Sequence, residues 1–180
     1  MTHGGQVLIG PRTGSKTAAF AIPDMLPPGP LQPGLPLKIV RVESLRDDLH
    51  HSGDSFTVSR WLEHVETALE AEECLTDGRG VVFACGNLRY LAAWPDAALL
   101  ERLFVRMAQA AGLATVPLPA DLRVRRTKGL TFAFNYGPDT IELPKGLVSL
   151  GCFVLGSAML PPAGIAVWSN MNPSTMSAVL

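Results

Sequence analysis

The sequence predicts an α/β region followed by a small antiparallel β-domain. An apolar run at residues 6–10 indicates a buried strand, and an amphipathic pattern at residues 96–111 indicates a helix packed on a sheet. Beyond these, short apolar runs alternate with glycine and proline turn signals, without helical spacing, as in small antiparallel domains. We therefore expect one domain at residues 1–117, a β-domain at 118–170 and a tail at 171–180.

Composition favours a folded chain and excludes several classes of partner. Hydrophobic residues make up 47% of the 180 residues and charged residues 17%, enough for a buried core. Fifteen basic against sixteen acidic residues give a net charge of -1, so neither nucleic acid nor a membrane surface is expected as a partner. Cys74, Cys85 and Cys152 have no CxxC spacing, which predicts reduced thiols in the cytoplasm.

Proline content and the alternation of apolar and polar residues predict the structure of the segments that follow the first strand. Prolines remove backbone donors and fix φ, so the proline-rich residues 22–36 are expected to form an irregular loop. Residues 37–45 alternate between apolar and polar positions and predict a strand. The charged residues 46–55 predict an exposed loop.

Residues 58–73 are ambiguous between helix and strand. Leu62, Val65 and Leu69 have helical spacing, whereas the alternation at residues 64–67 suits a strand. Propensity favours the helix.

A hairpin and a helix follow. Apolar residues 81–85 and 88–92 flank Gly86-Asn87, a two-residue sequence that closes tight hairpins. In the helix at 96–111, Asp96 is the expected N-cap and Gly112 the stop. The apolar stripe of this helix comprises Leu99, Leu100, Leu103, Phe104 and Met107.

The predicted β-domain consists of short strands separated by Lys-Gly, Gly-Pro and Pro-Pro turns, with no helix between them. The strands are expected at residues 122–127, 130–136, 140–143, 150–155 and 165–168.

The sequence GPRTGSKT at residues 10–17 superficially matches a phosphate-binding loop. The pattern GxxxxGK[ST] requires a second glycine at position 15, where Ser15 stands. Such a loop also opens a helix, and Pro23 arrives too early for one to form. Nucleotide binding therefore remains a disfavoured alternative, and no cofactor is expected.

No catalytic or metal-binding residue is assigned. Glycoside hydrolysis needs two carboxyl groups facing each other across a sugar, and acids close together in the chain are expected on a solvated face instead. These acids are Glu63, Glu66, Glu70, Glu72 and Glu73. His50 and His51 lack metal-ligand spacing and are expected in an exposed loop, and His64 is expected to be a partly buried structural residue.

Aromatic residues offer a second alternative, a carbohydrate-binding module in the β-domain. Aromatic side chains stack on sugars but more often fill cores, so core or interface packing is favoured for them. The residues concerned are Trp61, Trp94, Trp168, Phe132, Phe134 and Tyr136.

Several segments taken together resemble family-42 β-galactosidases, over roughly residues 4–168. GPRTGSKT, IPDMLPPGPLQ, LPLKIVRVESL, RWLEHVE and LRYLAAWPDAALLERLF resemble the trimerisation domain of that family. LRVRRTKGLTFAFNYG and FVLGSAMLPPAGIAVW are similar to its small carboxy-terminal β-domain. The resemblance implies a partial flavodoxin-like (glutamine-amidotransferase-like) α/β domain, entered midway at the first strand, followed by the antiparallel domain.

The resemblance also implies what the chain does. In that family a TIM barrel carries the two catalytic glutamates, and a barrel takes ~200 residues at minimum, more than this chain has. The chain is therefore interpreted as a non-catalytic carboxy-terminal fragment of a β-galactosidase with an oligomerisation or scaffold role. The expected partner is another copy or a barrel-containing β-galactosidase chain.

Overall fold

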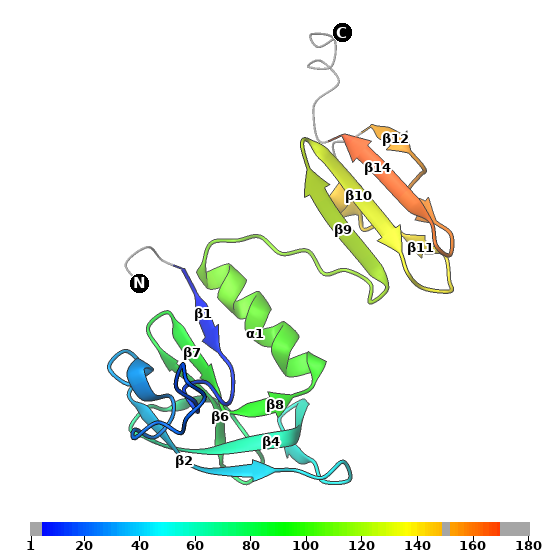
Figure 1. The fold of residues 1–180 in the computed structure, drawn as a ribbon. Helices are drawn as coiled ribbons and strands as arrows, with labels where there is room; N and C mark the ends of the chain where they lie inside the picture. The colour runs from blue at the N-terminus through cyan, green and yellow to red at the C-terminus, as the bar shows by residue number, and fades with distance from the viewer. Residues whose placement is uncertain (1–4, 149–151, 170–180) are drawn as a thin grey trace. The chain divides into compact units, whose positions relative to one another are not determined.

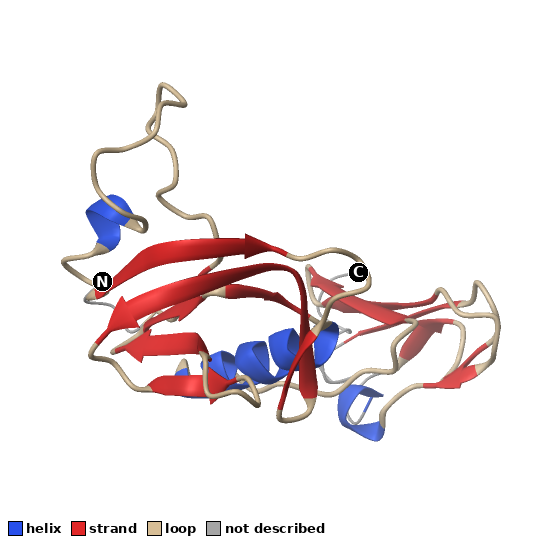
Figure 2. Cartoon of the chain, turned by 90° about the horizontal axis from the view of Figure 1, so that it is seen from below, coloured by secondary structure: helices blue, strands red, loops and turns tan. Residues whose placement is uncertain are grey.

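The computed structural model describes residues 5–148 and 152–169. The chain divides into two compact units, Met1–Thr115 (unit 1) and Val116–Leu180 (unit 2) (Figure 1). Strands dominate both units, as Figure 2 shows in red. No helix in the described part of the chain is long and apolar enough to cross a membrane.

The first sheet of unit 1 contains the predicted hairpin. Its order is β1 (Val7–Ile9), β7 (Leu88–Leu91), β6 (Gly80–Cys85) and β5 (Ala71–Cys74). Strands β6 and β7 turn at Gly86-Asn87, which confirms the hairpin. Strand β1 pairs in parallel with β7, whereas the other pairs are antiparallel. The expectation that β1 is fully buried is wrong: Val7 is 39% exposed, because β1 is an edge strand.

The second sheet of unit 1 is built around a long strand, β4 (Phe56–Thr67). Strand β4 pairs with β2 (Leu37–Ser44), β3 (His51–Gly53) and β8 (Ala93–Pro95). Strand β2 matches its prediction, whereas residues 46–55 are not simply a loop, because β3 forms a hairpin with β4.

The helix favoured for residues 58–73 is wrong, since β4 and β5 occupy this range. The pairing of β4 with β8 shifts register between Val58 and Leu62, around Arg60, which has a φ of 63°. The spacing of Leu62, Val65 and Leu69 imitates a helix although these residues share no single face. Leu62 belongs to the apolar cluster that contains Val82 and Leu91, whereas Val65 and Leu69 pack against the cluster that contains Phe83 and Tyr90.

Two apolar clusters meet at the β6–β7 hairpin. Because β7 is buried on both faces, neighbouring hairpin residues enter different clusters. Val82 and Leu91 belong to the first cluster, while Phe83 and Tyr90 belong to the second. The first cluster also contains Leu45, Phe56, Val58, Leu62, Leu75, Val81, Ala93, Leu99 and Leu103, and the second contains Leu35, Leu37, Ile39, Leu88 and Ala92.

Helix α1 (Ala97–Ala110) covers the first cluster. Asp96 caps the helix by accepting a 3.1 Å hydrogen bond from the Leu99 amide, as predicted. Leu99, Leu103 and Met107 are buried, but Phe104 is 56% exposed, so the apolar stripe is narrower than expected. The helix ends at Ala110, and Gly112 follows its cap with a φ of 71°, which suits glycine.

Unit 2 is a four-stranded antiparallel sheet with a small pair of strands beside it. The sheet order is β12 (Phe153–Leu155), β14 (Ile165–Ser169), β10 (Leu130–Asn135) and β9 (Leu122–Thr127). Strand β11 (Ile141–Glu142) pairs with β13 (Met159–Leu160). The predicted strands are present, but β13 was missed, and the expected turn at 145–146 lies in a short helix, α2 (Lys145–Val148). Residues 150–151 and the tail at 171–180 lie outside the described residues.

Candidate functional site

A buried carboxylate, that of Glu63 on β4, anchors the chain that follows β1. Glu63 is 3% exposed. Its Oε1 accepts hydrogen bonds from the Arg12 amide (2.7 Å) and from Trp61 Nε1 (3.0 Å), and its Oε2 accepts one from the Tyr90 hydroxyl (2.6 Å). The expected solvated position of Glu63 is therefore wrong, because three donors replace its water.

Charges around Glu63 complete this anchor. Burying a carboxylate is costly unless hydrogen bonds and charge compensate it. The Arg12 guanidinium lies over the Trp61 ring, 5.0 Å from its centroid, which holds a positive charge close to the site. Burial, together with the hydrogen bond to Glu63, raises the pKa of Tyr90 far above its usual range. Tyr90 therefore keeps its proton and remains a donor to Glu63.

The loop at residues 10–17 packs against the proline-rich segment instead of opening a helix. A Cβ added to Gly14, whose φ is 73°, would lie 2.5 Å from the carbonyl oxygen of Pro28, so glycine is required here. The next helical element is the single 3₁₀ turn η1 (Gly29–Leu31). The loop therefore lacks the helix N-terminus that binds phosphate in a nucleotide site.

An exposed apolar arm, residues 18–31, follows this loop and ends with η1. A turn with hydrogen bonds from the Phe20 and Ala21 amides to Thr17 holds its start. Figure 2 shows η1 and the adjoining loop to one side of the strands of unit 1. The arm carries large exposed apolar side chains: Phe20 (84%), Ile22 (79%), Met25 (50%), Leu26 (50%) and Leu31 (38%). Such a concentration on a surface is typical of an interaction site.

The arm continues onto the edge strand β2. The Ile39 amide donates a 2.8 Å hydrogen bond to the Pro27 carbonyl and so joins the strand to the arm. A hollow of about 240 Å³ between them is lined by Met25, Leu26, Gln32 and Lys38. Further along β2, Val40 is 50% and Val42 48% exposed. We call the arm together with the exposed residues Lys38, Val40 and Val42 the arm–edge face.

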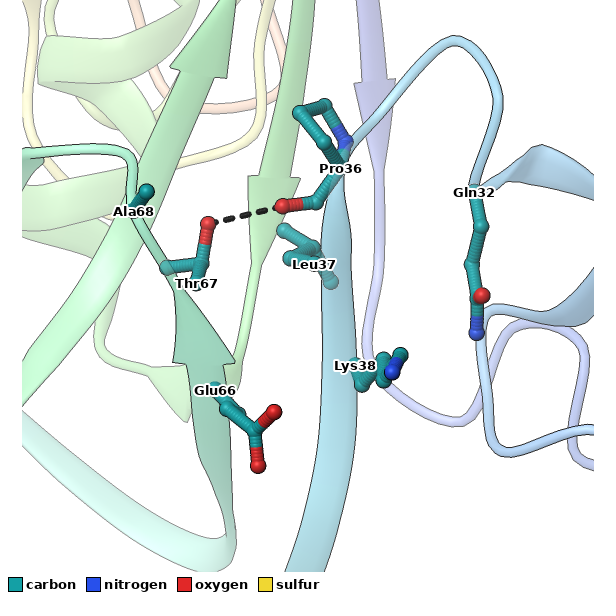
Figure 3. Close-up of a pocket in the computed structure, with 7 residues that line it drawn as sticks. All are labelled: Gln32, Pro36, Leu37, Lys38, Glu66, Thr67 and Ala68. Atoms are coloured by element: carbon teal, nitrogen blue, oxygen red, sulfur yellow. Dashed lines mark hydrogen bonds between the residues drawn. The ribbon is translucent and has the colours of Figure 1, made fainter.

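A groove of about 420 Å³ borders this face (Figure 3). Thr67 Oγ1 donates a 2.8 Å hydrogen bond to the Pro36 carbonyl and ties β4 to the start of β2. Lys38 and Glu66 stand on paired positions of the two strands, and both are exposed. The groove thus adds opposite charges beside apolar residues. It is lined by Gln32, Pro36, Leu37, Lys38, Glu66, Thr67 and Ala68.

A second charged cluster lies around Glu43 on β2. His64 Nε2 is 2.6 Å from Glu43 Oε1, and His51 Nε2 is 4.0 Å from Oε2. The hydrogen bond with His64 lowers the pKa of Glu43. Arg79 bonds to both His51 Nδ1 and Asp77, and it holds the pKa of Asp77 at about 2. His51 is therefore part of β3 and of this cluster, which corrects the exposed loop expected for it.

The remaining acids are divided between ion pairs and solvent. Glu73 pairs with Arg102 and Arg106 of α1 at 2.9 and 2.8 Å, and Glu72 pairs with Arg89 at 2.9 Å, so these two acids are not merely solvated. Glu66 and Glu70 are exposed, as expected. Among the described residues, no group of three His, Cys, Asp or Glu side chains is arranged to hold a metal ion. The three cysteines are free thiols.

The arm and its anchor lie within a part of the chain that matches a known sequence family. The sequence model of the β-galactosidase trimerisation domain matches residues 1–114. The chain belongs to this family. The match covers nearly all of unit 1, including the whole arm–edge face, and it confirms the resemblance read from the sequence.

Relatives extend the likeness into unit 2. A β-galactosidase of Thermus thermophilus is 47% identical over 171 residues, which cover 92% of this chain and 26% of that protein. The crystal structure of a β-galactosidase from the psychrophilic Marinomonas ef1 has a TM-score of 0.87 at 33% identity, over 94% of this chain and 26% of that one. The β-galactosidase of Halorubrum lacusprofundi gives 0.80 at 27% identity, over 93% of this chain and 28% of that one. The chain thus spans about a quarter of the length of such relatives.

The aromatic residues named from the sequence have different environments. Trp168 is 1% exposed and lies in the core of unit 2, and Trp61 belongs to the Glu63 anchor. Trp94, at 52%, and Tyr136, at 74%, are exposed instead. Core packing therefore accounts for Trp168 but not for Tyr136. In this member of the trimerisation domain family, the described strands pair mostly antiparallel and form no βα repeat of a barrel.

Proposed function

We propose that this chain is the part of a β-galactosidase that holds copies of the enzyme together, and that it does not cleave glycosides itself. The observation that carries the proposal is the arm–edge face, an apolar surface fixed in position by the Glu63 anchor. This face lies within the part of the chain that matches the trimerisation domain family. We assign β-galactosidase activity to the whole assembly because the relatives are named β-galactosidases.

The physical properties of the face suit self-association. Stable subunit interfaces are more apolar than ordinary surface and have a polar rim, here supplied by Lys38 and Glu66 beside the groove. The loop before the arm is tied to Glu63 through the Arg12 amide, and the arm itself is tied to β2 through the Ile39 amide, so little conformational entropy is lost when a partner binds. A ring of three copies needs a contact between two different patches of the chain, and the arm provides a protruding one.

Sedimentation velocity of the chain over a range of concentrations tests the assembly. We expect a species larger than the monomer, and we expect Phe20→Ser combined with Ile22→Ser to shift it to monomer because two exposed apolar contacts are lost. Phe104→Ser is the matched control, since Phe104 is exposed on α1 outside the face. A monodisperse monomer of the unaltered chain at all concentrations refutes the proposal, as does an equal effect of the control.

The absence of glycosidase activity is tested separately. A retaining glycosidase holds two carboxyl groups ~5 Å apart across the sugar. Here Glu43 and Glu63 accept hydrogen bonds from neighbouring side chains, and Glu72 and Glu73 are held in ion pairs. We expect no release of nitrophenol from a nitrophenyl galactoside by the purified chain. Release that rises in proportion to the chain's concentration contradicts this expectation.

The finer fold assignment also belongs to this proposal. We infer that β1 belongs to a flavodoxin-like parallel sheet, which would accept a further strand along its open edge. This inference is supported by the parallel pairing of β1 with β7 and by the exposure of Val7. The proposal includes the domain limits of 1–117 and 118–170. Hydrogen exchange of the β1 amides tests the inference. We expect it to slow when a barrel-containing β-galactosidase chain is added, and unchanged exchange in a complex that forms argues against it.

A further inference from the structure

Unit 2 carries a row of aromatic side chains on one face of its sheet. Side chains alternate between the faces of a strand, and on β10 Thr131, Ala133 and Asn135 point into the unit and are buried. Phe132 and Phe134 take the other face, with ring centroids 6.4 Å apart and planes within 8° of parallel. Tyr136, two positions further, is 74% exposed. The three rings therefore form an accessible row that the core does not use.

The neighbouring strands place polar and apolar groups on either side of this row. Phe132 stands opposite Arg125 on β9 and Val167 on β14. Phe134 in turn stands opposite Arg123 and Ile165. Arg123 donates to the carbonyls of Ala120 and Leu122, whereas Arg125 forms no ion pair within the described residues and is exposed. Guanidinium donors thus border one side of the rings and aliphatic side chains the other.

A hollow of about 600 Å³ lies at the end of the row. Its lining includes Phe134, Tyr136, Pro138, Pro162 and Ile165 and contains no charged side chain. Four of the nine lining residues have ring-shaped side chains. The hollow is large enough for a small organic ligand, since ligand pockets range from about 300 to 1,000 Å³.

Buried Asn135 fixes the two loops that wall the hollow. Its Nδ2 donates to the carbonyls of Asp139 (2.7 Å), Leu160 (3.0 Å) and Pro161 (3.0 Å). Its Oδ1 accepts from the Gly137 amide at 2.8 Å. Asn135 is 3% exposed, so these bonds are shielded from water. The hollow is therefore formed before any ligand arrives, and little ordering cost accompanies binding.

We propose that the aromatic row and the hollow bind a neutral oligosaccharide. A sugar ring presents apolar C–H groups on its faces, which suit Phe134 and Tyr136, while its hydroxyl groups accept hydrogen bonds from a guanidinium such as that of Arg125. No charged side chain lines the hollow itself, so its walls suit a neutral ring. The proposal is independent of self-association, because it concerns unit 2 and not the arm–edge face.

Amide chemical shifts of the full chain, followed during titration with lactose, cellobiose or maltose, test this site. We expect saturable shifts at Gly137, Ala163 and Gly164, which line the hollow. Tryptophan fluorescence is not a suitable readout, since Trp168 is 1% exposed. Tyr136→Ala is expected to weaken binding about tenfold through the lost stacking, whereas Tyr136→Trp preserves it.

Val154→Ala is the matched control, because Val154 is 63% exposed on β12 and does not line the hollow. It is expected to leave the titration unchanged, and a thermal melt of each variant confirms folding. The proposal is overturned if none of the three sugars gives a saturable shift, or if Tyr136→Ala binds as tightly as the parent. A single-stranded oligonucleotide that shifts these amides when the sugars do not also overturns it.

Discussion

Replacing Glu63 by alanine removes the acceptor on which the arm depends. The substitution leaves the Arg12 amide, Trp61 Nε1 and the Tyr90 hydroxyl without their partner. A buried donor without a partner costs about 1–3 kcal/mol, and Tyr90 is 0% exposed, while Arg12 regains water as the loop opens. We therefore expect Glu63→Ala to lower the free energy of unfolding by about 3 kcal/mol. Urea denaturation measures this loss.

The isosteric variant Glu63→Gln separates the hydrogen bonds from the charge. A glutamine can accept from Arg12 and Trp61 through its oxygen and donate to the Tyr90 hydroxyl through its amide group. We expect it to cost about 1 kcal/mol, because hydrogen bonds to a charged acceptor are the stronger ones.

Limited trypsin digestion links this stability to the arm. In Glu63→Ala the loop loses its tie to β4, so cleavage after Arg12 and Lys16 is expected to accelerate well before the remainder of unit 1 unfolds. In Glu63→Gln the cleavage rate should stay near that of the parent. If Glu63→Ala costs less than about 1 kcal/mol, or leaves the loop protected, the anchor reasoning fails.

Further substitutions test other parts of unit 1. Gly14→Ala forces a Cβ against the Pro28 carbonyl at positive φ and should destabilise the chain by about 2 kcal/mol in a urea titration. Leu103→Ala, in the core, should cost about 2–5 kcal/mol, whereas Phe104→Ala on the exposed side should cost about 0.5 kcal/mol or less; equal losses would contradict the helix orientation. Arg79 lowers the pKa of Asp77 to about 2 in the folded chain, so as the pH falls Asp77 takes up its proton in the unfolded chain before it does so in the folded chain. The stability that this ion pair contributes above pH ~4 is therefore lost as the pH falls toward 2. Melting temperatures of Asp77→Asn should show a shallower fall over this window than those of the parent.

Local signals explain what the sequence predicted correctly. The hairpin depends on Gly86-Asn87 between two apolar runs, and the helix on Asp96 with its periodic leucines. Each signal lies within a few residues of the element it specifies. Strand β4 was missed because Leu62 and Val65, three positions apart as on a helix, pack into different apolar clusters, which sequence spacing does not reveal.

The anchor and the exposed face depend on contacts between distant residues. Arg12 and Tyr90 lie 51 and 27 positions from Glu63, so sequence spacing held no sign that they meet one carboxylate. Proline content predicted that residues 22–36 are irregular, yet it could not show that Ile22 and Met25 remain exposed. Exposure of an apolar side chain is decided by which other elements pack over it, and composition does not contain that information.

The β6–β7 hairpin has a consequence for how unit 1 responds to assembly. Its residues are divided between a cluster beneath α1 and a cluster adjoining the start of β2, so neither cluster can loosen without disturbing the same two strands. Cooperativity between the two halves is therefore built into the hairpin. A neighbouring copy bound at the arm would raise the melting temperature of α1 as well, although it touches no residue of that helix.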